Sequence, residues 1–180
     1  MVSGRQMSKR IGTIQGFGKA QLRLLAKMLK LAREITGDHY KLSSDEAARL
    51  PVEIRTLADL QEFEIQSGEI LAYIARYGYK DPRMGRSQDL YQVNVQDHNI
   101  LDRLLSDQEE IEFSPLMLYV LTHELIHVIR FVKFLTPFHQ GDSDKLQEER
   151  RVHFVTHKLL SKVSMDGMDK VLEKYEHLAL

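Results

Sequence analysis

A long and almost uninterrupted apolar stretch, residues 116–132, constrains the fold of this chain more than any other feature. The stretch is broken mainly by the pentapeptide His-Glu-Leu-Ile-His at residues 123–127. Ser114 and Pro115 precede it, and both are residue types favoured at a helix N-terminus. We therefore expect a helix from residue 114 to about residue 135, and its apolar flanks indicate that it is substantially buried.

Within this helix, His123 and His127 are four residues apart, so their side chains project from one face, about 40° apart. Their imidazole nitrogens can converge on one cation at about 2 Å. Glu124 lies about 100° round the axis from His123. It is poorly placed to join the histidines as a ligand but can reach a water bound to the metal. This is the arrangement of the His-Glu-x-x-His motif, which combines two metal ligands with a general base.

The face that carries the two histidines is predicted to be covered, because Tyr119, Phe131 and Phe134 share it. A buried carboxylate and two buried imidazoles need partners, or they cost several kcal/mol. A bound cation satisfies all three groups together. The alternative is a polar stripe satisfied by ion pairs, with Arg130 pairing Glu124.

A third protein ligand is needed if one coordination position is to stay open for water. Glu149 is the best candidate, and His153 lies one helical turn further on the same face. A turn at residues 137–141 would let the two helices pack antiparallel and bring Glu149 toward the histidines of the pentapeptide. The sequence therefore predicts a metal-binding helix pair across residues 114–163.

Two alternatives for the third ligand stay open. Glu148 replaces Glu149 if the second helix is rotated by one residue, and His139 or His153 would complete a set of three histidines. Because the chain has no cysteine, its ligands must be imidazole, carboxylate or water, which also suit iron, nickel and manganese. A di-iron carboxylate site requires a second Glu-x-x-His beside residues 124–127, and the sequence has none.

On these residues, the segment 114–163 resembles the gluzincins, zinc peptidases whose third ligand is a glutamate on a following helix. Thermolysin and the short minigluzincins, which include repressor-cleaving bacterial peptidases, belong to that group. The resemblance implies a zincin-like fold and a metallopeptidase that hydrolyses a peptide bond through a zinc-activated water. The residues it assigns are the Zn²⁺ ligands His123, His127 and Glu149 and the general base Glu124.

The sequence departs from the gluzincin pattern at one position. The family has an Asp or Asn four residues after the ligand glutamate, hydrogen-bonded to a zinc-bound histidine. Here that position is His153, which either orients a ligand or binds metal itself. A further hydrogen-bond donor to the reacting carbonyl is not defined by the motif, although His139, His157 and Tyr91 are candidates.

The rest of the chain predicts one helix-dominated α+β domain over residues 1–180. Segments 69–79 and 89–97 are rich in β-branched and aromatic residues and predict a small antiparallel β-hairpin. In the zincin fold type an edge strand aligns the substrate backbone, and residues 89–97 are the expected edge. The remaining expectations are a flexible arm at 1–16, a helix at 19–36 stopped by Gly37, a short helix after a capping box at Ser43 and Glu46, a helix from Pro51 to Leu60, a helix from Asp144 to Val163, and a last helix ending near His177.

The amino-acid composition limits the kinds of partner that this chain is expected to bind. The chain has 25 basic and 26 acidic side chains, so charge gives no reason to expect nucleic acid or an anionic membrane. No uninterrupted apolar run approaches the roughly 18 residues needed to span a bilayer, and the N-terminus lacks the apolar segment of a secretory signal. We expect a cytoplasmic protein with a peptide or protein substrate, and the sequence does not specify the oligomeric state. The alternative is a non-catalytic metal-binding domain that serves interaction or regulation.

Overall fold

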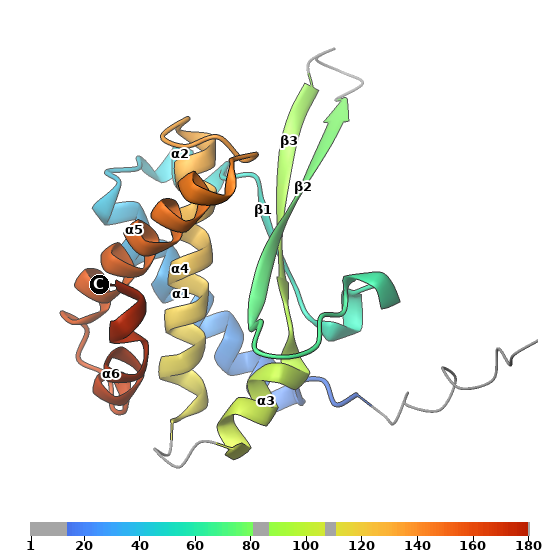
Figure 1. Ribbon diagram of the computed structural model, residues 1–180, viewed down its shortest axis with the longest axis vertical. Helices are drawn as coiled ribbons and strands as arrows, with labels where there is room; N and C mark the ends of the chain where they lie inside the picture. Colours follow the sequence, from blue (N-terminus) through green and yellow to red (C-terminus); the bar gives the residue numbers. More distant parts are fainter. Residues whose placement is uncertain (1–13, 81–86, 107–110, 180) are drawn as a thin grey trace, which may run out of the picture.

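The computed structural model describes residues 14–80, 87–106 and 111–179 (Figure 1). The helix-dominated α+β class expected from the sequence is confirmed. In chain order the elements are α1 Lys19–His39, α2 Ser44–Ala48, β1 Val52–Arg55, two short 3-10 helices at Leu57–Asp59 and Glu62–Glu64, β2 Ala72–Lys80, β3 Ser87–Val95, α3 Asp97–Ser106, α4 Phe113–Val132, α5 Asp142–Leu160 and α6 Met168–Ala179.

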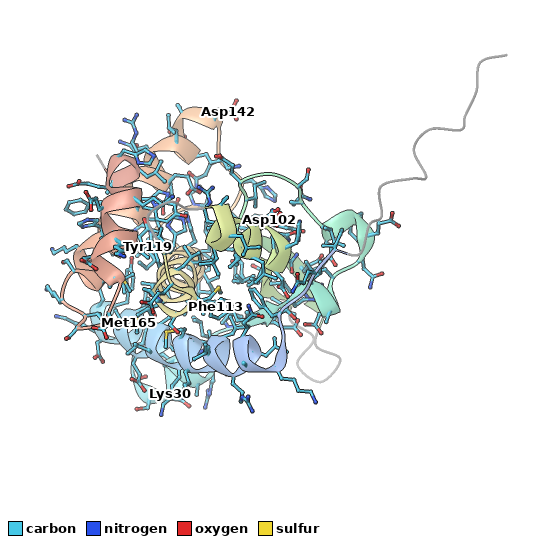
Figure 2. All side chains as sticks on the ribbon, turned by 90° about the horizontal axis from the view of Figure 1, so that it is seen from below. Lys30, Asp102, Phe113, Tyr119, Asp142 and Met165 are labelled. Atoms are coloured by element: carbon cyan, nitrogen blue, oxygen red, sulfur yellow. The ribbon has the colours of Figure 1, made fainter. Side chains whose placement is uncertain are left out.

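Helix α4 is the centre of the molecule. The sheet lies on one side of it and α5 and α6 on the other, while α1 packs along it (Figure 1), and a view along its axis shows side chains packed around it (Figure 2). Every residue from 115 to 130 is buried. By length and apolar composition alone α4 could cross a membrane, a feature missed in the sequence, but 83% of that stretch is buried inside the protein. Such a composition is also what a core helix requires.

The ends of α4 differ from those predicted. Glu112 is its N-cap rather than Ser114, and Pro115 lies in the first turn, where a missing N–H is tolerated. The helix ends at Val132 rather than near residue 135. Phe134 adopts a positive φ of 53° and its side chain is 94% exposed. The expectation that Phe134 covers the histidine face was therefore wrong.

The predicted hairpin is confirmed, because β2 and β3 pair antiparallel from Ala72 opposite Val95 to Lys80 opposite Ser87. The connecting residues 81–86, which form most of the predicted turn, lie outside the described part of the chain. Strand β3 is the middle strand of a sheet ordered β1-β3-β2. The expectation that residues 89–97 form the edge strand was therefore wrong, and β2 is the edge on the side of α4.

The helix expected from Pro51 to Leu60 is also wrong. Residues 52–55 form β1 instead, which pairs parallel with β3 so that Val52 lies opposite Tyr91. This makes the sheet mixed rather than purely antiparallel. Val-Glu-Ile-Arg alternates apolar and polar side chains with a period of two, which is the signature of a strand rather than a helix.

Smaller differences concern the helix ends. Helix α1 continues through Gly37 to His39, and the chain turns at Lys41, which has a φ of 53°. The capping box at Ser43 is confirmed, because its amide bonds the Glu46 carboxylate and its hydroxyl accepts from the Glu46 amide. Helix α5 starts earlier than predicted, at Asp142 after the N-cap Gly141, and ends at Leu160; α3 was not predicted.

The predicted flexible arm lies largely outside the described residues, which begin at residue 14. Close to its end, the Phe17 amide donates a hydrogen bond to the buried carboxylate of Asp97 at 2.8 Å. The Phe17 ring packs edge-on against Phe113 at the start of α4, with ring centroids 5.1 Å apart. The chain is therefore fixed to the core from Phe17 onward.

Candidate metal centre

Three side chains predicted as metal ligands converge between α4 and α5. The Nε2 atoms of His123 and His127 are 3.2 Å apart. One carboxylate oxygen of Glu149 lies 3.4 Å from the first Nε2, and the other oxygen lies 3.4 Å from the second. The two histidines are buried, and Glu149 is partly exposed. The structure thus brings together all three residues that the gluzincin resemblance implies.

These separations fit a small tetrahedral cation. Ligands at roughly 2.0–2.1 Å from a tetrahedral ion lie about 3.3–3.4 Å from one another, close to the 3.2 Å between the two Nε2 atoms and the 3.4 Å from each Nε2 to a different oxygen of Glu149. The electrostatics favour positive charge at their centre. Burial raises the pKa of Glu149, but hydrogen bonds and charge from the two histidines outweigh it and hold that pKa well below its usual range. Burial lowers the pKa of His127, but Glu149 and the neighbouring carboxylates outweigh it and raise that pKa.

The choice between Glu148 and Glu149 follows from their partners. Glu148 is buried and forms an ion pair with Arg130 of α4, with the Arg130 Nη2 donating to its Oε2 at 2.9 Å and the Nε donating to its Oε1. The carboxylate of Glu148 is therefore occupied, whereas that of Glu149 faces the histidines. The alternative pairing of Arg130 with Glu124 is not formed, because Arg130 bonds Glu148 instead.

Glu124 lies in the same cavity as the three ligands and is 9% exposed. Burial raises its pKa, and the charges of His123 and His127 act in the opposite direction. Among the described residues it has no ion-pair partner. The carboxylate of Glu124 is therefore not used in an ion pair and lies beside the histidines. Such a position would suit a general base.

His153 lies against His123, with ring centroids 4.3 Å apart, and its Nδ1 is 2.9 Å from the hydroxyl of Tyr119. Donor atoms of His123, Glu149 and His153 all lie within 4.8 Å of one another. Burial, together with the charge of His123, lowers the pKa of His153 to about 4, so its imidazole is neutral at pH 7. Burial raises the pKa of Tyr119, so its hydroxyl stays protonated.

His153 does not take over the role of the Asp or Asn in the gluzincin pattern. That role requires a hydrogen bond to the second nitrogen of a ligand histidine. The Nδ1 atoms of His123 and His127 are buried and have no hydrogen-bond partner among the described residues. The only side chain bonded to His153 in the described part of the chain is Tyr119.

The centre lies in a cavity of about 850 Å³. Its walls come from the α4 face, the segment 69–74 that leads into the edge strand β2, α5, and the end of α6. Phe131 and Phe138 form an aromatic patch in it, with ring centroids 5.1 Å apart, and His127 stacks on Phe131 at 5.9 Å. A cleft bounded by a strand edge and an apolar patch suits an extended peptide.

Of the three donors suggested by the sequence, His139 lines the cavity, whereas His157 and Tyr91 do not. Tyr91 is buried and stacks on Phe131. Tyr119 was expected on the histidine face as a covering side chain, but its hydrogen bond to His153 was not predicted. No protein-family model, curated protein or solved structure matches this chain.

Proposed function

We propose that this protein is a zinc-dependent metallopeptidase in which His123, His127 and Glu149 hold Zn²⁺ and Glu124 is the general base. The observation that carries the proposal is the set of ligand separations, 3.2, 3.4 and 3.4 Å, in a cavity that also contains Glu124. Two imidazoles and one carboxylate are the donors of catalytic zinc sites that retain one open position.

When bound, zinc supplies Lewis acidity and brings the pKa of a water toward neutrality. The chain's own contribution is proton transfer. Glu124 accepts a proton from the water while the water oxygen bonds to the peptide carbonyl carbon. It then gives that proton to the leaving amine as the C–N bond breaks.

The proposed substrate is an extended peptide or a protein segment. Strand β2 has β3 on one side, and residues 71–74 at its start line the cavity. A peptide added to the free edge of β2 would pass the metal centre with its backbone hydrogen-bonded, which is a common mode of peptide recognition. The aromatic patch of Phe131 and Phe138 would then receive a large apolar side chain.

The experiment is a metal analysis combined with a peptide-library digest read by mass spectrometry. The purified protein is expected to contain one zinc per chain and to cleave a subset of peptides. Glu124→Gln should keep the zinc and lose hydrolysis by several orders of magnitude, because the side chain keeps its shape but no longer accepts a proton. Glu173→Gln, a substitution at an exposed carboxylate on α6, is the matched control and should match the wild type.

The alternative, a non-catalytic metal-binding domain, is tested by the same samples. It is favoured by the closeness of His153 to His123 and Glu149, since a fourth protein ligand would close the site. Under this alternative the wild type binds zinc and cleaves no peptide. Retained cleavage by Glu124→Gln would instead refute the proposed mechanism.

A further inference from the structure

The direction of the hydrogen bond between Tyr119 and His153 follows from the other partners open to the tyrosine hydroxyl. Tyr119 is 3% exposed, and His153 is the only hydrogen-bond partner of its hydroxyl among the described residues, at 2.9 Å. If the hydroxyl only accepted, its own proton would have no acceptor among the described residues, and a buried donor without an acceptor costs roughly 1–3 kcal/mol. Tyr119 therefore donates to Nδ1 of His153.

This direction fixes the tautomer of His153. A neutral imidazole carries one N–H, and the nitrogen that accepts a hydrogen bond is the one without it. With Nδ1 accepting from Tyr119, the proton is on Nε2. The Nε2–H is then the group that His153 offers to the cavity, which His153 lines together with Glu124 and the three metal-site residues.

We propose that His153 donates this Nε2–H hydrogen bond to the carbonyl oxygen of the scissile peptide bond, and that Tyr119 is the positioning residue that holds it in the donor tautomer. The inference rests on the proposed function and assigns the donor that the motif leaves undefined. His153 is one helical turn after Glu149 on α5 and packs against His123. Because its donor atom lies within 4.8 Å of those of His123 and Glu149, a donor at this place is next to the metal centre.

The same tautomer bears on whether His153 is a fourth ligand. A metal bound at Nε2 of His153 would have to displace the proton there, as it would at the Nε2 atoms of His123 and His127, which are hydrogen-bonded to Glu149. The three proposed ligand residues already lie 3.2–3.4 Å from one another. In the described part of the chain, neither Glu149 nor His127 is a hydrogen-bond partner of His153.

In the reaction, His153 keeps its proton. Water oxygen bonds to the carbonyl carbon, the electron pair of the C=O bond moves onto its oxygen, and Glu124 takes the proton of the water. The Nε2–H of His153 stabilises the negative oxygen during this step. The C=O bond then re-forms as the C–N bond breaks, and Glu124 protonates the amine. Removing one such donor typically lowers the rate about 10²–10³-fold.

The first test reads the tautomer directly. In protein labelled with ¹⁵N-histidine and loaded with zinc, long-range ¹H–¹⁵N spectra are expected to show His153 protonated on Nε2 and unprotonated on Nδ1. Tyr119→Phe should weaken this preference, and the Nδ1–H form should become populated. A proton on Nδ1 in the wild type, or a His153 Nε2 signal typical of zinc coordination, would overturn the proposal even if no peptide substrate were known.

The second test uses substitutions and the peptide found in the library digest. His153→Asn should keep one zinc per chain with unchanged affinity, lower kcat about 10²–10³-fold and leave KM nearly unchanged. Tyr119→Phe should lower kcat about tenfold, the equivalent of one hydrogen bond. His157→Asn, on the same helix but outside the cavity, is the matched control and should behave as the wild type.

The outcomes separate the two proposals. If the wild type cleaves peptides and His153→Asn keeps its zinc and its kcat, the donor role is refuted while the hydrolase survives. If His153→Asn loses zinc, His153 is a ligand and the donor role is again refuted. If the zinc-loaded wild type cleaves nothing, the proposed function fails, and the NMR measurement still decides which nitrogen carries the proton.

Discussion

Arg130 of α4 and Glu148 of α5 form a buried, doubly hydrogen-bonded ion pair one residue before Glu149. Both side chains are less than a tenth exposed. This contact fixes the rotation of α5 about its axis, and the next carboxylate in the sequence is thereby directed at the histidines of α4.

The pair predicts a large effect for a single substitution. Glu148→Leu should lower the free energy of unfolding by about 3–5 kcal/mol, because it leaves the Arg130 guanidinium buried without its carboxylate. The double variant Arg130→Met with Glu148→Leu should recover much of that loss, since no charge is left unpaired. Urea denaturation of the metal-free protein measures both. A single variant within 1 kcal/mol of the wild type would contradict the buried-pair interpretation.

A second prediction concerns the metal. Loss of a side chain that only hydrogen-bonds a metal ligand weakens metal binding by up to about 100-fold. Because Glu149 is proposed to bind the metal directly, Glu149→Ala should weaken zinc binding by at least that factor. At zinc concentrations about 100 times the dissociation constant, the wild type should gain about 2.7 kcal/mol of stability from the metal, and the variant should lose most of this gain. Calorimetric titration and thermal unfolding with and without a chelator measure the two effects. Glu176→Ala, on the exposed face of α6, is the control, and equal zinc affinity in both variants would place the third ligand elsewhere.

Much of the centre was predictable from local sequence, because helical periodicity alone sets the angle between residues three or four apart. The convergence of His123 with His127 and the shared face of Glu149 with His153 follow from that periodicity. The choice of Glu149 over Glu148 does not. It depends on Arg130, 18 residues away, and only the packing of α5 on α4 reveals that partner.

The errors in the fold have the same origin. The helix predicted after Pro51 is a strand because Val52 and Ile54 pair with β3, some forty residues further along the chain. That same pairing makes β3 the middle strand and moves the free edge to β2. The pattern of apolar and polar residues within one segment shows which face of a helix or strand is apolar, but not which other segment will cover that face.

Thr122 offers a test of the packing of α4. It is fully buried, and its hydroxyl has no hydrogen-bond partner among the described residues. Thr122→Val replaces the hydroxyl with a methyl group of similar shape, so the free energy of unfolding should rise by about 1–2 kcal/mol. Chemical denaturation of the metal-free protein checks this. A destabilised variant would show that the hydroxyl is hydrogen-bonded in solution.

The last prediction concerns acid stability and a network far from the metal centre. Glu64, which is 4% exposed, accepts hydrogen bonds from the Gln61 amide at 2.8 Å, from Arg55 at 3.1 Å and from the Tyr77 hydroxyl at 3.2 Å. The Gln61 hydrogen bond and the Arg55 charge outweigh burial and lower the pKa of Glu64. This carboxylate joins β1 to the edge strand β2.

The pKa of Glu64 in the folded state is below its value of about 4.3 in the unfolded state, so the folded state favours the ionised carboxylate. The resulting stability is fully present above that value and is lost as the pH falls through the folded pKa. In chelator-treated protein, Glu64→Gln should therefore be less stable than the wild type at pH 6, by about 1–3 kcal/mol, and the difference should shrink as the pH falls below about 4. Urea midpoints from pH 3 to pH 6 measure it, with Glu62→Gln, an exposed neighbour, as the control. A difference that stays constant across this range would mean that Glu64 titrates equally in the folded and unfolded states, which its burial beside Arg55 does not permit.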